Sequence, residues 1–310
     1  MRFRSRYEGF DRYQRTHAWI GYPLAVRQKY ADDQGGYLAA AVTYYGFFSV
    51  FPLLLVFVSV LGFVLRGHAQ LEQTIINSAL GQFPVIGRAL RIHALHGSAT
   101  ALALGIAVAL WAGMGVFLAA ENAMDQLWGI PLRRRPGFLR ARAKALLLLV
   151  LLGGGALATT VLGSLGTVGS SLGIAWKLVS IVLAIGLNFA LFWIAMRVLT
   201  TRDVTWRDVR GGAIAAAVLY ELLQLVGGYY VGHVLAHASN LYGTFGLVIG
   251  LLSWIYLATH ILLLAAEGNV VARYRLWPRS LSLAGGQPPT DADRRALKLR
   301  DREVGADVPG

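Results

Sequence analysis

Residues 43–55 read TYYGFFSVFPLLL, an apolar run that contains two tyrosines, a glycine, a serine and a proline. They belong to a longer apolar segment, 37–65, which exceeds the roughly 20 residues that a helix needs to cross a bilayer. Pro52 removes a backbone donor and frees the carbonyl of Phe48, and the Ser49 hydroxyl can partly satisfy the interrupted ladder. The stretch therefore predicts a membrane-spanning helix with a bend beside a partly polar interior. A kink that only aids packing is the alternative interpretation.

The whole chain has the composition of an integral membrane protein. Of its 310 residues, 56% are hydrophobic and 15% are charged, and the mean hydropathy is +0.54. One soluble core cannot bury that much apolar surface. Six apolar runs are long enough to span a bilayer. They cover residues 37–65, 99–120, 145–168, 174–196, 211–232 and 243–266. We predict an all-α membrane protein with six transmembrane helices and amphipathic interfacial helices.

The distribution of basic residues predicts the orientation of these helices. The formal net charge is +13, and 25 of the 29 lysines and arginines fall on one side of a six-span topology. By the positive-inside bias, the N and C termini are both predicted to be cytoplasmic. Basic residues beside a bilayer gain about 1 kcal/mol each from anionic lipid. The charge therefore predicts anionic membrane lipids as partners at the cytoplasmic face, and no nucleic acid.

The segments outside the spans differ in composition. Residues 1–36 form a basic cytoplasmic N-terminal arm, and the transmembrane domain is predicted over residues 37–275. Within that domain, residues 66–98 place apolar and polar side chains on different helical faces, which predicts an extracytoplasmic amphipathic segment. Residues 276–310 mix both charge signs with proline and glycine and contain few large apolar side chains. This composition predicts a disordered cytoplasmic tail.

Small residues recur at four-residue spacing within the apolar runs. Small side chains let membrane helices approach closely, so these positions predict helix-packing seams. The glycines concerned are Gly113 in the second run, Gly212 in the fifth, and Gly246 and Gly250 in the sixth.

Polar residues inside the runs are the candidates for function. Glu221 lies near the middle of the fifth run, where an acidic residue costs about 2.5–3.5 kcal/mol on insertion scales. Gln224 lies one turn further along, and Asn188 lies near the middle of the fourth run. Glu221 either forms a hydrogen bond that holds helices together or belongs to a substrate or proton path, and we favour the second interpretation. The same polar interior is predicted to include Tyr44, Tyr45, Ser49 and Pro52.

Two further groups of polar residues lie at the ends of the runs. The cytoplasmic ends carry Glu121, Asn122, Asp125 and Glu267. On the opposite side, His233 and His237 have the i, i+4 spacing that lets two imidazoles bind one metal ion on a helix face. Histidines satisfied by water or lipid headgroups are the alternative. The chain has no cysteine, so it has no disulfide and no thiolate metal site.

Four stretches resemble a known family in sequence and in order. They read VTYYGFFSVFPLLL from residue 42, AAENAMDQLWGI from 119, WRDVRGGAIAAAVLYELLQLVGGYY from 206 and LYGTFGLVIGLLSWIYLATHILLLAAEGNV from 241. Together they resemble the YihY/virulence factor BrkB family of bacterial inner-membrane proteins, some of which carry the older label ribonuclease BN. The resemblance implies a multi-pass protein of the cytoplasmic (inner) membrane, often described as a permease and linked to the envelope. Where family members often carry a basic residue, three positions after the acid of the fifth span, this chain has Gln224.

Three classes of function are compatible with these patterns. They are a transporter or translocation factor for a lipidic or amphiphilic envelope substrate, an ion-coupled small-solute carrier, and a non-transporting membrane scaffold. The few charged residues within the spans favour the first class, because a strongly hydrated substrate is expected to meet more of them. A homo-oligomer or an envelope partner protein fits all three.

No enzymatic activity and no cofactor are expected. The cytoplasmic segments contain no group of carboxylates and histidines suited to metal-dependent RNA hydrolysis. They also contain no Gly-rich phosphate loop followed by lysine and a hydroxyl residue, which argues against ATP-driven pumping.

Overall fold

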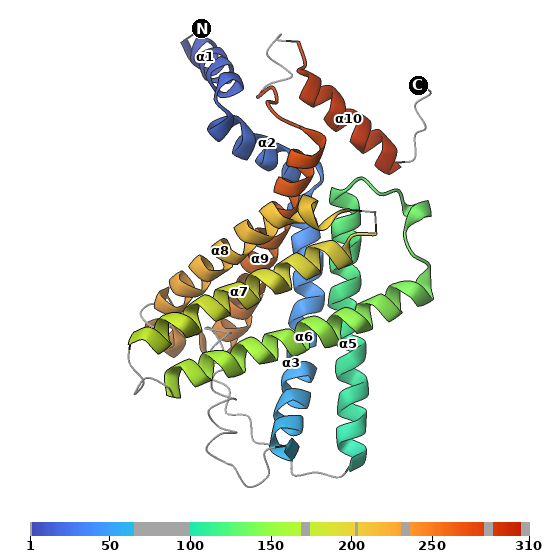
Figure 1. Ribbon diagram of the computed structural model, residues 1–310, viewed down its shortest axis with the longest axis vertical. Coiled ribbons are helices and arrows are strands. Elements are labelled where there is room, and N and C mark those ends of the chain that lie inside the picture. Colours follow the sequence, from blue (N-terminus) through green and yellow to red (C-terminus); the bar gives the residue numbers. More distant parts are fainter. Residues whose placement is uncertain are drawn as a thin grey trace.

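The chain folds into α-helices, and the described residues contain no strand (Figure 1). The computed structural model describes residues 2–64, 99–168, 174–201, 204–230, 236–281 and 288–304. The predicted all-α class is therefore confirmed. The segment 66–98, predicted to be amphipathic and extracytoplasmic, lies outside the described residues.

Six long helices form where the six apolar runs lie. They are α3 (Gly35–Val64), α5 (Ala99–Leu127), α6 (Phe138–Val168), α7 (Ile174–Leu199), α8 (Trp206–Tyr230) and α9 (Ala236–Tyr274). A short 3-10 turn, η1 (Leu132–Arg134), lies between α5 and α6. Several helices extend beyond their apolar runs, because helical hydrogen bonding does not require apolar side chains. Helix α6, for example, begins seven residues before the run at 145.

Three of the six helices are long and apolar enough to cross a membrane. Within the described ranges, the segments that meet this condition are Gly35–Leu54, Gly105–Leu127 and Val248–Tyr274. A shorter apolar stretch, Ile185–Leu199, lies in α7. The positions of all six helices agree with the sequence, while length and apolarity support a membrane crossing for α3, α5 and α9.

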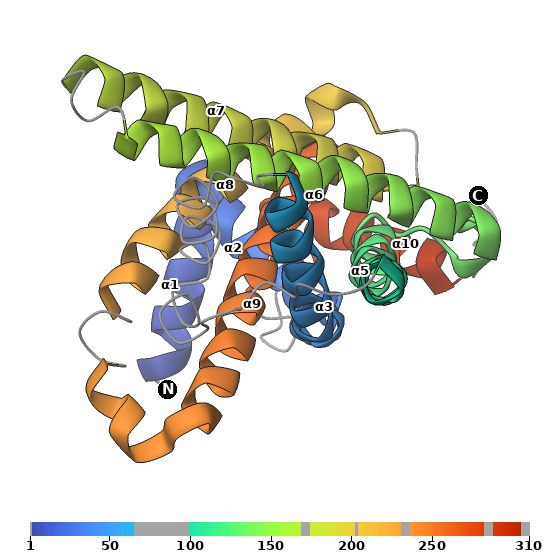
Figure 2. The ribbon, with the colours of Figure 1, turned by 90° about the horizontal axis from the view of Figure 1, so that it is seen from below.

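The six long helices pack in a closed ring. Contacts run from α3 to α5 and then through α6, α7 and α8 to α9, which returns to α3. Helices α6 and α7 run obliquely across α3 and α5, as the two views show (Figure 1 and Figure 2). The ring places α7 beside α8, and these two helices carry Asn188 and Glu221.

The tightly packed core lies at the end of the ring nearest the chain termini, called the terminal end below. Its buried side chains include Met124 and Leu127 at the end of α5 and Leu263 and Val270 in the second half of α9. The outer faces of the ring carry exposed large apolar side chains instead. Examples are Leu147, Val150, Val182, Leu222 and Val226. Such an apolar exterior suits contact with acyl chains and would be unusual in a soluble monomer.

Three further helices lie at the terminal end: α1 (Arg2–Thr16), α2 (Ala18–Asp32) and α10 (Asp291–Val304). Helix α2 packs on α9. Helices α1 and α10 lie on the same side of the ring (Figure 1). The basic N-terminal arm is therefore helical, and it packs on the ring through α2.

The prediction of a disordered tail is wrong for residues 291–304, which form α10. Ala292, Ala296 and Leu299 are buried, and their spacing of four and three residues places them on one helical face. The abundant charges of the tail occupy mainly the other faces of this helix. Residues 282–287 and 305–310 lie outside the described part of the chain.

Two of the four predicted packing glycines are in close helix contacts. A Cβ at Gly113 would lie 2.9 Å from the side chain of Leu149, so α5 and α6 approach closely there. A Cβ at Gly212 would collide with the backbone oxygen of Ala265 and with the side chain of Asn269, both in α9. The other two, Gly246 and Gly250, are half-buried in α9. The neighbouring helices therefore approach closely at Gly113 and Gly212.

Candidate functional site

Two polar residues from separate apolar runs form a hydrogen bond between α7 and α8. The Asn188 amide nitrogen Nδ2 donates to Glu221 Oε1 at 2.7 Å, and both side chains are half-buried. One turn further along α8, Gln224 Nε2 donates to the Tyr220 hydroxyl at 3.0 Å. The structure thus brings Asn188 and Glu221 together and places Gln224 beside them.

The Asn188–Glu221 pair lies beside the apolar exterior of the ring. Val218 and Leu222 of α8 are exposed, and so is Ile185 of α7, three residues before Asn188. A half-buried carboxyl group next to lipid-facing side chains costs free energy unless a polar group meets it. This arrangement can hold the polar end of an amphiphile while its apolar part stays among the acyl chains.

The predicted tyrosines of α3 lie apart from this pair. Tyr44 and Tyr45 are 59% and 47% exposed, and their ring centroids are 5.5 Å from each other. No hydrogen bond or ring contact joins either tyrosine to Glu221 within the described residues. The expectation of one polar interior shared by α3 and α8 therefore differs from the structure, in which Tyr44 is exposed and the half-exposed ring of Tyr45 lies against Gly115 of α5.

Helix α3 continues through Pro52 from Gly35 to Val64. Ser49 is buried, and its hydroxyl donates to the carbonyl oxygen of Gly46 at 2.8 Å. The hydroxyl therefore bonds within the preceding turn of its own helix, and not to the Phe48 carbonyl that the proline leaves free.

Buried acidic residues gather at the terminal end of the ring. Glu121 of α5 accepts a hydrogen bond from Lys144 Nζ of α6 at 2.5 Å. Asp125 is fully buried and accepts two hydrogen bonds from Thr201, at 2.8 Å from the backbone nitrogen and at 2.7 Å from the hydroxyl. Asn122 is exposed. Glu121 and Asp125 thus join α5 to the neighbouring segments by polar contacts.

Glu267 of α9 belongs to a second buried group at this end. Its side chain has no exposed surface, and Oε2 lies 3.7 Å from Lys29 Nζ of α2. Lys29 also forms an ion pair with Asp33 and donates to the carbonyl oxygen of Leu127 at 3.2 Å. Burial raises the pKa of Asp33 above its usual value, although Lys29 acts to lower it. We call these residues the Lys29–Asp33–Glu267 cluster.

The sequence pattern predicts Glu267 as a candidate site residue but does not predict Lys29 or Asp33. Their i, i+4 spacing just before the first apolar run was a readable signal of a local ion pair. Nothing in the local pattern predicts that this pair meets α9.

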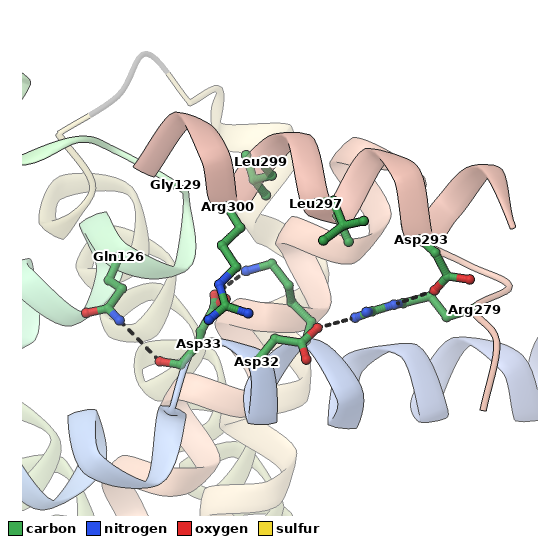
Figure 3. Close-up of a pocket in the computed structure, with 11 residues that line it drawn as sticks. Asp32, Asp33, Gln126, Gly129, Arg279, Asp293, Leu297, Leu299 and Arg300 are labelled. Carbon is green, nitrogen blue, oxygen red and sulfur yellow. Dashed lines mark hydrogen bonds and ion pairs between the residues drawn. The ribbon is translucent and has the colours of Figure 1, made fainter. Parts of the chain in front are cut away.

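A pocket of about 110 Å³ lies beside the cluster, between α2, the end of α5 and α10 (Figure 3). Its polar lining includes Lys29, Asp33, Gln126, Arg279, Asp293 and Arg300. Arg279 links two sides of the pocket, because its guanidinium lies 2.7 Å from Asp32 and 3.2 Å from Asp293. The lining carries both charge signs, so the pocket suits water and small polar groups.

Asp293 anchors the start of α10 at this pocket. Burial alone would raise the pKa of its carboxyl group, but hydrogen bonds from Thr290, Ser280 and Arg279 outweigh burial and lower the pKa. The ionised form of Asp293 therefore holds the C-terminal helix in place.

The predicted histidine metal site is not covered by the structure. His233 lies outside the described residues, and so does the side chain of His237, although its backbone belongs to the first turn of α9. Among the residues that are described, no three His, Asp or Glu side chains are arranged to hold a metal ion. The histidine pair stays a prediction.

Comparison with known proteins identifies the family. The family described as Virulence factor BrkB matches residues 26–284, which include the whole ring and the Lys29–Asp33–Glu267 cluster. The inner membrane protein YhjD of Escherichia coli strain K12 is 28% identical over 84% of this chain and 83% of its own length. A UPF0761 membrane protein of Chromohalobacter salexigens is 29% identical over 89% of this chain and 71% of its own length.

No solved structure matches the chain. The family match, the names of the two relatives and the apolar helices nevertheless agree with one another. The protein is a helical membrane protein that belongs to the virulence factor BrkB family.

Proposed function

We propose that the protein translocates a lipidic or amphiphilic envelope substrate through the contact between α7 and α8. The observation that carries this proposal is the hydrogen bond between Asn188 and Glu221, which is half-buried beside exposed apolar side chains. A pair used only to hold helices together would be expected deeper in the packed core.

The chemistry of the pair suits a polar headgroup. The Glu221 carboxyl accepts hydrogen bonds when ionised and donates one when protonated, and the Asn188 amide does both. A headgroup can therefore replace one partner of the existing bond instead of entering hydrocarbon without a partner. The apolar part of the same substrate would lie against Val218, Leu222 and Val226, which are exposed on α8. A small hydrated ion gains nothing from that apolar surface.

The proposal includes six membrane crossings, with both termini in the cytoplasm. Six helices that follow one another in a ring alternate in direction when each crosses the bilayer, and α1 and α10 lie on one side (Figure 1). The basic residues of α1 and α10 would then face anionic lipid. The proposal assigns the protein no enzymatic reaction, no cofactor and no nucleic-acid partner, so the purified protein should leave defined RNA intact.

The orientation can be tested directly because the chain has no cysteine. Single cysteines at positions 73 and 239 should react with a membrane-impermeant thiol reagent applied to intact spheroplasts. A cysteine in place of Arg134, the last residue of η1 between α5 and α6, should be protected until the membrane is opened. The reverse pattern contradicts the proposed topology.

An ion-coupled small-solute carrier is the second candidate. The observation that favours it is the Lys29–Asp33–Glu267 cluster, because buried ionisable groups in membrane proteins often mark ion paths. This candidate places the path at the terminal end of the ring instead of between α7 and α8.

The function is tested in proteoliposomes made with purified protein. Lipid exchange between leaflets is followed by chemical bleaching of a fluorescent phospholipid, and ion leakage is followed with an entrapped dye. We expect the protein to increase lipid exchange above that of protein-free vesicles while ion leakage stays at the background level. Ion or solute flux without lipid exchange would favour the carrier, and neither flux would favour a scaffold.

A further inference from the structure

Glu267 is a fully buried acid that faces Lys29 and Asp33. Among the described residues, no donor lies within 3.5 Å of either carboxylate oxygen in hydrogen-bonding geometry, the Asp33 carboxyl faces the Glu267 carboxyl, and the side chain of Glu267 has no exposed surface. Its nearest charged group is Lys29, at 3.7 Å. A carboxylate in this position has lost water without gaining hydrogen bonds, which is among the least favourable states for an ionised group.

The charges around Glu267 do not balance. Lys29 forms its ion pair with Asp33, whose carboxyl lies close enough to repel the charge of Glu267. With both acids ionised, one ammonium faces two carboxylates in a buried space. Within the described part of the chain, Lys29 is the cation that acts on Glu267. One negative charge is therefore left without compensation.

We propose that Glu267 is a proton-binding site that holds one proton at neutral pH and exchanges it through the pocket beneath α10. A proton removes the excess charge without needing space or new ligands. The inference rests on the packing of α2 against α9 and does not depend on transport by α7 and α8.

The pocket supplies a route for the proton. It measures about 110 Å³, which is enough for several water molecules, and Lys29 and Asp33 line it. Figure 3 shows Asp33 and Arg300 at its side near α10. A proton can pass from pocket water to Asp33 and from there to Glu267, because the Asp33 carboxyl faces the Glu267 carboxyl.

A hydrogen-bonded pair formed by α2 and α9 lies within electrostatic reach of Glu267. The Tyr30 hydroxyl and His260 Nδ1 are 2.7 Å apart, and the charge of Glu267 acts on Tyr30. Burial, together with Tyr256 and Glu267, raises the pKa of Tyr30 to about 12. Tyr30 therefore stays neutral and adds no charge beside Glu267.

The other charged groups near α9 are occupied by partners of their own. Helix α3 carries no charged residue between Gly35 and Val64. On α5, Glu121 and Asp125 are bound by Lys144 and Thr201. On α8, Asp208 is paired with Arg273, and hydrogen bonds from Thr205 lower its pKa against the effect of burial. None of these groups supplies the missing positive charge at Glu267.

A metal cation fits the same place poorly. The Lys29 ammonium lies near both carboxylates and would repel a metal ion, and divalent ions need several converging oxygen ligands. The charge imbalance is one unit, which a single proton corrects.

The proposal is tested by infrared difference spectroscopy on the purified full-length protein. The wild type should show the carbonyl band of a protonated, buried carboxylic acid at pH 7, and Glu267→Gln should lose one such component. Glu121→Gln is the matched control, because Glu121 is also buried but has Lys144 as its own cation. That control should leave the component unchanged. A spectrum of Glu267→Gln identical to that of the wild type in this region would overturn the proposal.

Asp33→Asn provides an independent variant should Glu267→Gln fail to fold. Removing the second acid leaves Lys29 and Glu267 as a balanced pair, so Glu267 should release its proton and the component should disappear at pH 7. Its persistence in Asp33→Asn would contradict the charge argument. Either result is independent of lipid exchange, so it is distinguishable from success or failure of the proposed function.

Discussion

The side-chain amide of Asn188 donates a 2.7 Å hydrogen bond to the carboxyl of Glu221 and so joins α7 to α8. The two residues lie in consecutive helices, and neither has a charged partner in its own helix three or four residues away. The hydrogen bond therefore depends on the packing of α7 against α8. It turns two isolated polar positions in the sequence into one site.

Removing this bond should cost little stability. Hydrogen bonds between membrane helices contribute about 0.6 kcal/mol on average in double-mutant cycles. We expect a coupling of that size between Asn188→Ala and Glu221→Ala, measured by reversible unfolding in mixed micelles. Additive effects of the two substitutions would show that the contact is absent in the folded protein.

Gly212 and Gly211 should respond to alanine in opposite ways. A Cβ at Gly212 collides with the backbone of Ala265 and with Asn269, whereas at Gly211 the nearest atom lies at 3.7 Å. Overpacking costs about 1–3 kcal/mol, so Gly212→Ala should destabilise the protein. Gly211→Ala should be neutral or stabilising, since alanine favours a helix over glycine by about 1 kcal/mol. Equal stability of the two variants would contradict the close packing of α8 on α9.

Lys144 and Arg273 form ion pairs that should differ in their contribution to stability. Lys144→Met leaves the buried Glu121 without its cation, and breaking a buried pair costs about 3–5 kcal/mol. Arg273 is 58% exposed in its pair with Asp208, so Arg273→Met should cost less than about 1 kcal/mol. The free energies of unfolding of the two variants measure both losses of stability. A larger loss of unfolding free energy for Arg273→Met than for Lys144→Met would contradict the assignment of Lys144 and Glu121 as the buried ion pair.

Acid should release α10 before it unfolds the ring. The pKa of Asp293 is lowered in the folded protein, so its contribution is present above the ordinary aspartate pKa of about 3.9 and is lost as the pH falls through the lower folded value. Cleavage of the C-terminal segment by an acid-active protease should therefore rise steeply below about pH 4.

Two substitutions test the same anchor at neutral pH. Asp293→Asn should show increased cleavage at pH 7, because it lacks the ionised carboxyl that Thr290, Ser280 and Arg279 bind. Asp291→Asn is the control, since Asp291 is exposed at the start of the same helix. Protection of Asp293→Asn equal to that of the wild type would show that the carboxylate does not anchor α10.

The sequence predicted the helical elements well because a membrane helix requires a long run of apolar residues. The described residues of all six runs lie within helices, and Gly113 and Gly212 lie at close helix contacts. Helix α10 was missed because many charges outweighed the short pattern of Ala292, Ala296 and Leu299. Composition over a whole tail is a weaker guide than the periodicity of one segment within it.

The site could be predicted only in part. Glu221 and Asn188 stood out because each is polar within an apolar run. Their hydrogen bond could not be predicted, because it depends on the packing of α7 against α8. Lys29 and Glu267 lie almost at opposite ends of the chain, and only the packing of α2 on α9 brings them together. The aromatic face of α3 misled the prediction, because tyrosines on the outside of a membrane helix and tyrosines in a polar interior have the same local sequence.

The most direct test of the account is lipid exchange by Glu221→Gln in proteoliposomes between pH 5 and 8. Glutamine keeps the size of the side chain and can still accept the bond from Asn188, but it cannot ionise. We expect Glu221→Gln to fold with the stability of the wild type and to lose lipid exchange or its pH dependence. Full lipid exchange by purified Glu221→Gln across this pH range, with the pH profile of the wild type, would contradict the role of Glu221 in translocation.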